Sequence, residues 1–362
     1  MTNITVHHMD TYYYTLSLHI LGLCQLPVNI LALYCILYKS HRNMSFYYKF
    51  LLAKYQALIS FCDFGVTILL APIVFYPHLG GLTAGVLSWL GASTIAIIVV
   101  SVCTVQWVGG TIVLLFYTRY TCSHTDSTSA MSDKKRIILG CLFCLSFHPG
   151  ELLTYYDLPE NMDKAKLELA AIWKDPPDLL WSRDTVVMGV CRICVSHILF
   201  TVQSMTMVVP ISICFLLTLR NLTRRNAKLS AATLKLQRKF LWMLVGQISV
   251  PTILMAAPLF LSFGAISYNP AMSSLCVFAI SNHGFLSSLF LLFANQPYRD
   301  FILSKLRRKR QNVIINVEAS TNHNPTEAVK RRVDIPANEE KKQTNDDLKP
   351  NSFVLQPITH IS

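Results

Sequence analysis

The apolar run GVLSWLGASTIAIIVVSVCTVQWVGGTIVLLFYT, residues 85–118, gives the clearest indication of how this chain folds. It contains no Asp, Glu, Lys or Arg, and Arg119 follows it directly. A helix needs about 20 mostly apolar residues to cross the hydrocarbon core of a bilayer. The run therefore predicts a membrane-spanning helix that is long enough to tilt or to extend beyond the lipid.

The composition of the whole chain supports the same interpretation. Charged residues make up 14% of its 362 residues, whereas soluble domains carry about 25%. Apolar residues reach 52%, and the mean hydropathy is +0.40. So little polar surface cannot cover so much apolar surface in water, which excludes a soluble enzyme. In a membrane protein the net charge of +12 indicates basic cytoplasmic loops rather than a nucleic-acid partner.

Seven apolar runs can be distinguished along the chain. They cover residues 15–38, 50–74, 85–118, 137–156, 186–219, 240–263 and 273–294. The fifth run contains Arg192 near its start, so its helix is expected to begin closer to Cys194. We predict an all-α membrane protein, a seven-transmembrane helix bundle within residues 15–297.

The Lys and Arg residues between the runs predict the orientation. The connections 39–49, 119–136 and 220–239, together with 298–310, hold twenty basic residues, and the segments on the other side hold four. Because cytoplasmic loops carry the basic excess, residues 1–14 are expected to be extracellular. The sequon at Asn3 is then a candidate glycosylation site.

After the last apolar run the sequence becomes amphipathic and then polar. Residues 298–310 predict a short amphipathic cytoplasmic helix, with Phe301, Ile302 and Leu306 facing membrane lipid and a basic run meeting anionic headgroups. Residues 311–362 are polar, without apolar periodicity, and predict a disordered cytoplasmic tail.

The long outer loop 157–185 has a helical pattern of its own. Pro159 suits a first helical position, and Met162, Ala165, Leu169 and Ile172 recur at helical spacing. This predicts a short amphipathic helix over the mouth of the bundle. The alternative is a surface helix with no role in ligand binding.

A second group of candidate residues consists of polar side chains inside the apolar runs, where such groups usually face the bundle interior. Asp63 lies in the middle of the second run, and its natural partners are Asn29 and either Asn282 or His283. We predict a polar switch cluster joining the first, second and seventh spans, or else a static packing group. The cluster comprises Asn29, Asp63, Gln247, Pro251 and Asn282.

Several residues near the outer ends of the spans could line a pocket that opens outward. The candidates for ligand binding are Trp89, Glu151, His197, Gln203 and His283. A single histidine or tryptophan in a span is more often a core or interface residue, and that alternative stays open.

The expected cytoplasmic face carries a third group. Arg119 closes the third span, and the loop 220–239 consists largely of helix formers that extend the fifth and sixth spans. We predict that this face contacts a partner through Arg119, Tyr120, Arg238 and Lys239. The alternative for Arg119 is an anchor at the lipid interface.

Enzyme signatures are missing from the sequence. It contains no HExxH, GxSxG or P-loop pattern, and the pair His7-His8 has no further ligands at useful spacing. We therefore expect no enzymatic activity, no cofactor and no metal site.

Several motifs carry a family resemblance that runs from about Pro27 to Phe301. The strongest is Leu229-Ser230, Thr233 and Leu236-Gln237-Arg238-Lys239-Phe240, followed by Gln247 and Pro251. Others are Ser281-Asn282-His283-Gly284, Pro297-Tyr298-Arg299, Asp63, Pro72 and Tyr76-Pro77. In these motifs the chain resembles the nematode serpentine chemoreceptors of the Str superfamily, most closely class H, with class I as near neighbour.

The resemblance implies a G-protein-coupled receptor that binds an external small molecule and signals to a heterotrimeric G protein. It also implies a multi-pass protein of the plasma membrane, on sensory neuron cilia. Two departures stand out: Tyr117 occupies the position of the glutamate in the family's E-N-R-Y pattern, and the outer loops 75–84 and 157–185 contain no cysteine for a disulfide. The alternative function is a ligand-gated channel or transporter.

Overall fold

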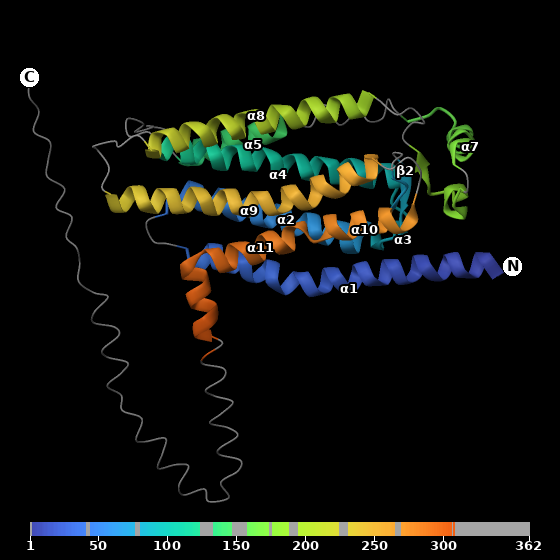
Figure 1. The fold of residues 1–362 in the computed structure, drawn as a ribbon, viewed down its shortest axis with the longest axis horizontal. Coiled ribbons are helices and arrows are strands. Elements are labelled where there is room, and N and C mark those ends of the chain that lie inside the picture. The colour runs from blue at the N-terminus through green and yellow to red at the C-terminus, as the bar shows by residue number, and fades with distance from the viewer. Residues whose placement is uncertain are drawn as a thin grey trace, which may run out of the picture. The chain divides into compact units, whose positions relative to one another are not determined.

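The protein is described by a computed structural model of residues 1–362. The described residues are 2–40, 44–76, 80–123, 133–146, 158–173, 176–187, 195–223, 231–264, 269–305 and 307. Long helices run side by side through this part of the chain (Figure 1). Five of them, among the described residues, are long and apolar enough to cross a membrane.

The first helix is longer than the sequence predicted. α1 covers Thr2–Tyr38 and contains Pro27, so residues 2–14 of the expected extracellular segment are helical rather than a separate arm. The backbone of Asn3 therefore lies within α1, and its side chain is outside the described residues.

The second span changes its helix type before it ends. α2 covers Phe46–Phe64 and continues as a π-helix, η1, over Gly65–Leu70. The start is four residues earlier than predicted because the side chain of Ser45 accepts a hydrogen bond from the Tyr48 N–H at 3.3 Å and caps the helix. The predicted end at residue 74 is wrong, since Ala71 turns left-handed (φ 40°) and residues 72–74 form a strand.

The third apolar run, 85–118, is not one helix. It contains a short helix α3, Val86–Trp89, and then α4, Thr94–Ser123. Gly91 has a φ of 79° between them, a conformation that glycine adopts without strain. The third span therefore begins at Thr94 and extends five residues past its predicted end.

The remaining spans are described in part. α5 covers Asp133–Leu145, α8 covers Val195–Thr223, and α9 covers Ala231–Gly264. α8 begins one residue after Cys194, as the position of Arg192 suggested. α8 and α9 also reach into the loop 220–239, which confirms the predicted helix extensions for the described residues.

The seventh span is two helices rather than one. α10 covers Pro270–Ser281 and α11 covers His283–Ala294, with Asn282 between them. Residues 296–305 are helical, so the helix predicted from 298 begins two residues earlier, and Phe301 does not simply face lipid. Its ring centroid lies 5.9 Å from that of Tyr34 on α1, and Lys39 Nζ lies 4.7 Å from it. Residues 308–362, with the whole of the predicted tail 311–362, lie outside the described residues.

A small sheet covers one end of the bundle, and no sequence pattern indicated it. β1 (Pro72–Val74), β2 (Gly80–Thr83) and β3 (Val186–Val187) pair antiparallel in the order β1-β2-β3. Residues 186–187 were expected to begin the fifth span, and they form β3 instead.

The predicted outer-loop helix is confirmed, with a different start. α7 covers Met162–Ile172, and Asn161 rather than Pro159 begins it by accepting a hydrogen bond from the Lys164 N–H at 3.1 Å. Ile172 is 56% exposed, and Trp173 is buried in its place.

α7, the sheet and the 3-10 turn η3 (Asp178–Trp181) share one core, here called the outer cap core. Its buried members are Phe75, Ala165, Leu169, Trp173, Leu180 and Val187.

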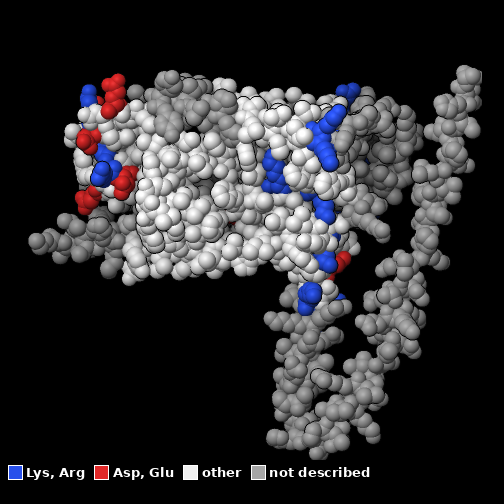
Figure 2. All heavy atoms as spheres, turned by 180° about the vertical axis from the view of Figure 1, so that it is seen from behind, with Lys and Arg blue, Asp and Glu red and all other residues white. Residues whose placement is uncertain are grey.

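Charged side chains gather at the two ends of the bundle, with a wide band of uncharged residues between them on the face that Figure 2 shows. Large apolar side chains on the long helices are exposed, among them Leu23, Leu216 and Ile253, which are 62%, 60% and 63% exposed. Such a surface is unfavourable in water and suits a bilayer. We call the end with the outer cap core the outer end and the opposite end, near Arg119, the inner end.

Candidate functional site

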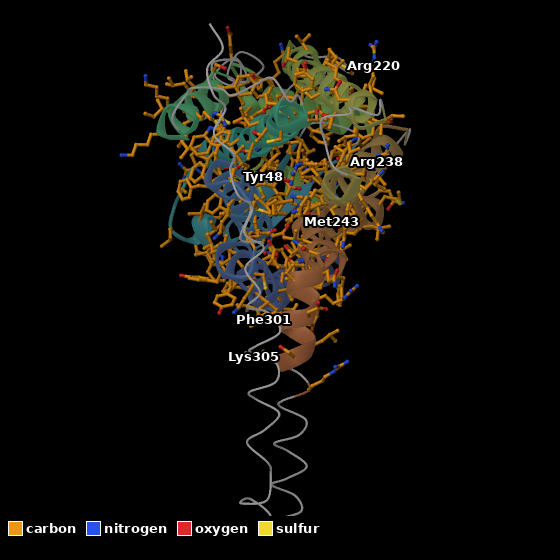
Figure 3. All side chains as sticks on the ribbon, turned by 90° about the vertical axis from the view of Figure 1, so that its left-hand side faces the viewer. Tyr48, Arg220, Arg238, Met243, Phe301 and Lys305 are labelled. Carbon is orange, nitrogen blue, oxygen red and sulfur yellow. The ribbon has the colours of Figure 1, made fainter. Side chains whose placement is uncertain are left out.

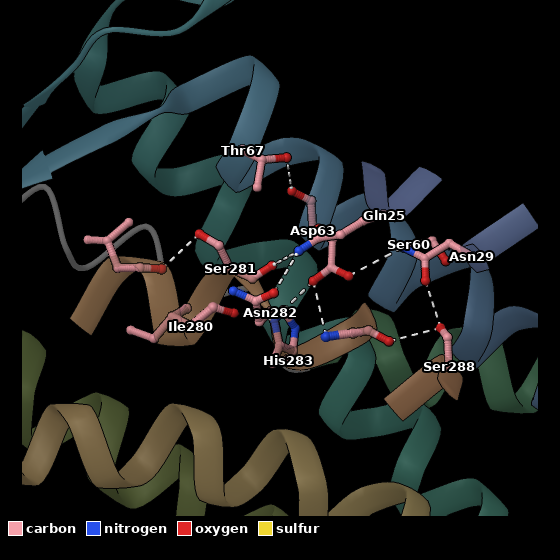
Figure 4. A network of polar contacts seen from close by, with 12 residues as sticks. Gln25, Asn29, Ser60, Asp63, Thr67, Ile280, Ser281, Asn282, His283 and Ser288 are labelled. Carbon is pink, nitrogen blue, oxygen red and sulfur yellow. Dashed lines mark hydrogen bonds and ion pairs between the residues drawn. The ribbon is translucent and has the colours of Figure 1, made fainter. Parts of the chain in front are cut away.

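Asp63 is the centre of a buried polar network, and it is 1% exposed. Its carboxylate accepts hydrogen bonds from Asn29 Nδ2 on α1 at 3.3 Å and from the backbone N–H of Gly284 on α11 at 3.1 Å. His283 Nδ1 lies 3.2 Å from Asp63 Oδ1. Burying a carboxylate is costly unless donors surround it, and here α1 and α11 supply them (Figure 4).

The break at Asn282 explains how the backbone of the seventh span reaches Asp63. The first N–H groups of a helix have no partner within the helix and carry a partial positive charge. The Gly284 N–H is one of these groups at the start of α11. A Cβ on Gly284 would lie 2.5 Å from Asp63 Oδ2, so the close approach requires glycine.

His283 is fixed by the same turn. Its Nδ1 lies 2.6 Å from the backbone carbonyl of Ile280, which can only accept. Nδ1 therefore carries the proton, since Asp63 and Ile280 both present oxygen to it.

Side-chain amides and a hydroxyl extend the network to three spans. Ser288 Oγ on α11 donates to Asn29 Oδ1 at 2.7 Å, and Gln56 Nε2 on α2 donates to Ser288 Oγ at 2.7 Å. Gln25 Nε2 on α1 donates to Asn282 Oδ1 at 3.2 Å. The network thus ties α1 and α2 to both halves of the seventh span.

The predicted switch cluster is assembled only in part. Asn29 and His283 reach Asp63, whereas Asn282 contacts Gln25 instead.

The two α9 residues of the predicted cluster lie apart from Asp63 in their contacts. The Gln247 carbonyl accepts from Ser287 Oγ at 3.0 Å, and Gln247 Nε2 is buried without a partner among the described residues. Pro251 is buried one turn further along α9.

An apolar cavity of about 290 Å³ lies beside the network. It is bounded by α2 and η1 on one side and by α4 on the other, and Ile280 and His283 close it toward the seventh span.

Of the two predicted ligand-binding residues whose side chains the structure describes, Trp89 and His283, His283 lines this cavity. Trp89 lies on α3, is 75% exposed, and its ring packs edge to face on His19 with centroids 6.2 Å apart. Glu151 lies outside the described residues, and His197 and Gln203 lie on α8 with side chains that are not described.

At the inner end, Arg119 is 8% exposed and packs between helices. Its Cζ lies 3.8 Å from the ring centroid of Tyr48 on α2 and 4.9 Å from that of Phe240 on α9. Nη1 lies 3.5 Å from Gln237 Oε1, also on α9. The alternative of an anchor at the lipid interface does not describe this buried contact, which we call the Arg119 cage: Arg119 with Tyr48, Gln237 and Phe240.

The other residues predicted for the inner face lie around this cage. Arg238 Nη2 donates to the Leu222 carbonyl at 2.6 Å and so caps the end of α8. Tyr120 is half-buried and Lys239 is exposed. Figure 3 views the bundle from this end, with Tyr48 and Arg238 labelled.

Tyr298 closes the inner end on the other side. It is fully buried, and its Oη lies 2.7 Å from Ser40 Oγ after α1. Burial raises the pKa of Tyr298 to about 12, so the hydroxyl stays neutral and available for this hydrogen bond.

Comparison with known families decides what kind of protein carries this network. A family described as "Serpentine type 7TM GPCR chemoreceptor Srh" matches residues 10–308. The chain belongs to the Srh family. This Srh protein is a G-protein-coupled chemosensory receptor of the plasma membrane, and the predicted resemblance to class H is confirmed.

The fold of the Srh receptor is similar to that of squid rhodopsin. The crystal structure of squid rhodopsin aligns with 91% of this chain and 93% of that chain, with a TM-score of 0.53 and 11% sequence identity. At this identity the likeness concerns the fold alone. No curated protein sequence matched the chain significantly.

Sequence reasoning missed several residues that hold the site of this Srh receptor together. The missed residues are Gln25, Tyr48, Gln56, Ser288 and the backbone of Gly284. Gln25 and Gln56 are polar residues inside apolar runs, the same signal that identified Asp63, so they could have been found. Tyr48 gave no signal, since its contact with Arg119 exists only when α2 and α4 pack.

Proposed function

We propose that this receptor alternates between a packing in which the Arg119 cage is closed and one in which it is open. In the closed packing, aromatic faces and an amide hold the guanidinium. In the open packing, α9 moves away and Arg119 contacts a heterotrimeric G protein. An external small molecule shifts the balance only if it binds the open packing more tightly.

The single observation that carries this proposal is the burial of Arg119 between α2 and α9. Receptors with an acidic neighbour can hold such an arginine by charge, but Tyr117 occupies that position here and is 53% exposed. A cation over an aromatic ring is worth about 2 kcal/mol when water is excluded. Two rings can therefore take over the restraint that a carboxylate would provide.

We include in the same proposal where the receptor lies in the cell and which of its segments lie on each side of the membrane. The receptor acts on sensory neuron cilia, with residues 1–14 outside, residues 311–362 in the cytosol as a disordered tail, and residues 298–310 against membrane lipid. The alternative of a channel or transporter receives no specific support from Asp63, whose carboxylate accepts bonds from α1 and α11 and does not line the cavity.

The test compares variants of the cage in cells that couple receptors to a measurable G-protein signal. Arg119→Ala is expected to lower the evoked signal by more than tenfold while surface delivery stays normal, because about 1.4 kcal/mol of lost interaction is already tenfold. Phe240→Ala is expected to raise the signal without ligand, since it removes one face of the cage.

Arg220→Ala is the matched control. Arg220 is an exposed arginine at the end of α8, outside the cage, and its variant should behave as the wild type. A wild-type response in Arg119→Ala would remove Arg119 from the mechanism.

A further inference from the structure

The cavity between α2 and α4 owes its volume to small side chains and to the π-helix. Gly65 begins η1, and a Cβ built there would meet only Leu70 Cδ1, at 3.7 Å. Val66 and Leu69 of the same segment also line the cavity. A π-helical turn is wider than an α-helical one and occurs often at functional sites. The space is therefore built into the second span.

The open side of the cavity faces lipid. Ala92, just before α4, and Ala96 and Val100, in its first turns, line it at a spacing of four residues, and all three are exposed, with Val100 at 59%. Phe61, on α2, is 49% exposed and also lines it. Exposed residues within two membrane spans contact hydrocarbon. A molecule dissolved in the bilayer can therefore reach the cavity sideways, between α2 and α4.

The inner wall of the cavity is connected to the polar network. The His283 ring lines the cavity, while its Nδ1 edge is held by Ile280 and Asp63. An occupant that touches the ring therefore contacts His283, the side chain that joins the seventh span to Asp63 on α2. No other residue of the cavity lining contacts the Asp63 carboxylate in the hydrogen bonds and ion pairs of the described residues.

We infer that this cavity binds the external cue, and that the cue is a small apolar molecule that reaches it from the bilayer. A cavity of about 150 Å³ holds benzene, and this one is about 290 Å³, which fits a molecule of roughly ten carbon atoms. The lining carries no side chain with a permanent charge, and its hydroxyls, on Ser101 and Thr104, donate to the backbone of their own helix, so a charged ligand would lose its hydration with no opposite charge to compensate it. This inference rests on the proposed function and identifies its ligand class.

The first experiment tests occupancy without signalling. Purified full-length receptor in lipid vesicles is irradiated with 3-phenyl-3-(trifluoromethyl)diazirine, a compact apolar photoprobe, and the adducts are located by mass spectrometry. We expect adducts on the cavity residues of α2, η1 and α4, and competition by naphthalene. Ala96→Leu fills the cavity and should reduce these adducts about tenfold, the effect of roughly 1.4 kcal/mol of overpacking.

Ala57→Leu is the matched control. Ala57 is exposed on α2 and does not line the cavity, so the same change there should leave the adducts unaltered. Equal labelling of wild type and Ala96→Leu would overturn the site. Competition by a long-chain fatty acid but not by naphthalene would overturn it too, since the occupant would then be membrane lipid.

The second experiment measures responses to apolar odorants in cells. Ala96→Leu should shift the effective concentration about tenfold upward, with unchanged surface delivery. An unshifted response would show that the cue binds elsewhere, and it would leave the proposed function standing. The proposed function has its own test. It fails if Arg119→Ala signals like the wild type, and this result does not depend on what the cavity binds.

Discussion

At the scale of single residues, the receptor depends on polar groups that are buried in pairs or larger groups. Asp63 has three partners within 3.3 Å, and Arg119 has two aromatic faces and an amide. Removing one member leaves the other buried without compensation, which usually costs more than the contact itself contributes. Changes at such positions are therefore expected to act strongly and not additively.

Gly284 provides the sharpest test at this scale. In Gly284→Ala the new methyl group would lie 2.5 Å from Asp63 Oδ2, so α11 must shift and the Asp63 contact must lengthen. Overpacking of this kind costs about 1–3 kcal/mol. We expect a lower thermal unfolding midpoint of the purified receptor.

Gly65→Ala is the control for Gly284→Ala, because its Cβ would meet one side-chain atom at ordinary distance. Adding Asp63→Ala should remove most of the penalty of Gly284→Ala. Independent, additive effects of the two changes would contradict the contact.

At the scale of elements, the outer cap core stabilises the outer loop without a disulfide. The nine described cysteines are all free, and the loops 75–84 and 157–185 contain none. The loop is held instead by β2–β3 pairing, by apolar packing and by Lys166. Lys166 is 4% exposed, and its Nζ donates to the Ser182 carbonyl at 2.7 Å, joining α7 to the segment after η3.

Lys166→Ala is therefore expected to loosen the cap. The change leaves the Ser182 carbonyl without its donor, at a cost of about 1–3 kcal/mol. Hydrogen exchange should become faster in residues 176–187, with little change in α2 or α4.

Lys164→Ala is the comparison for Lys166→Ala. The Lys164 side chain is 76% exposed, 4.0 Å from Glu168, and exposed pairs contribute little. Equal rates of hydrogen exchange in residues 176–187 of the two variants would exclude a structural role for Lys166.

At the scale of the whole molecule, the two ends of the bundle are built from different elements. The outer end carries the sheet, α3 and α7, whereas α8 and α11 end at the inner end (Figure 1). The Arg119 cage also belongs to the inner end. The polar network lies between them, and the cavity next to it opens to lipid. A signal that enters at the cavity must therefore pass from the seventh span and α2 toward α9.

The orientation itself is testable. Antibodies against epitope tags fused before Met1 and after Ser362 should stain the two tags under different conditions. We expect the first tag to be stained in intact cells and the second only after permeabilisation, because the basic segments belong in the cytosol. Staining of the second tag in intact cells would reverse the assignment of both ends.

The features that sequence could predict are those set by one chain segment at a time. Lengths of apolar runs gave the spans, helical spacing gave α7, and the rarity of carboxylates in lipid singled out Asp63. The boundaries differ from the predicted ones, because caps and breaks such as Ser45, Gly91 and Asn282 depend on local backbone geometry and a few hydrogen bonds.

The sequence by itself thus determined that this protein crosses a membrane with its basic segments on one side, because hydropathy and charge are properties of composition and order. Only the tertiary structure decided which polar groups meet. Asp63 and Gly284 are 221 positions apart, and Arg119 meets Gln237 across 118, so no local pattern encodes either contact. The cavity likewise arises because Gly65 has no side chain and Ala96 has only a methyl group. Such a space between helices exists only once the helices pack.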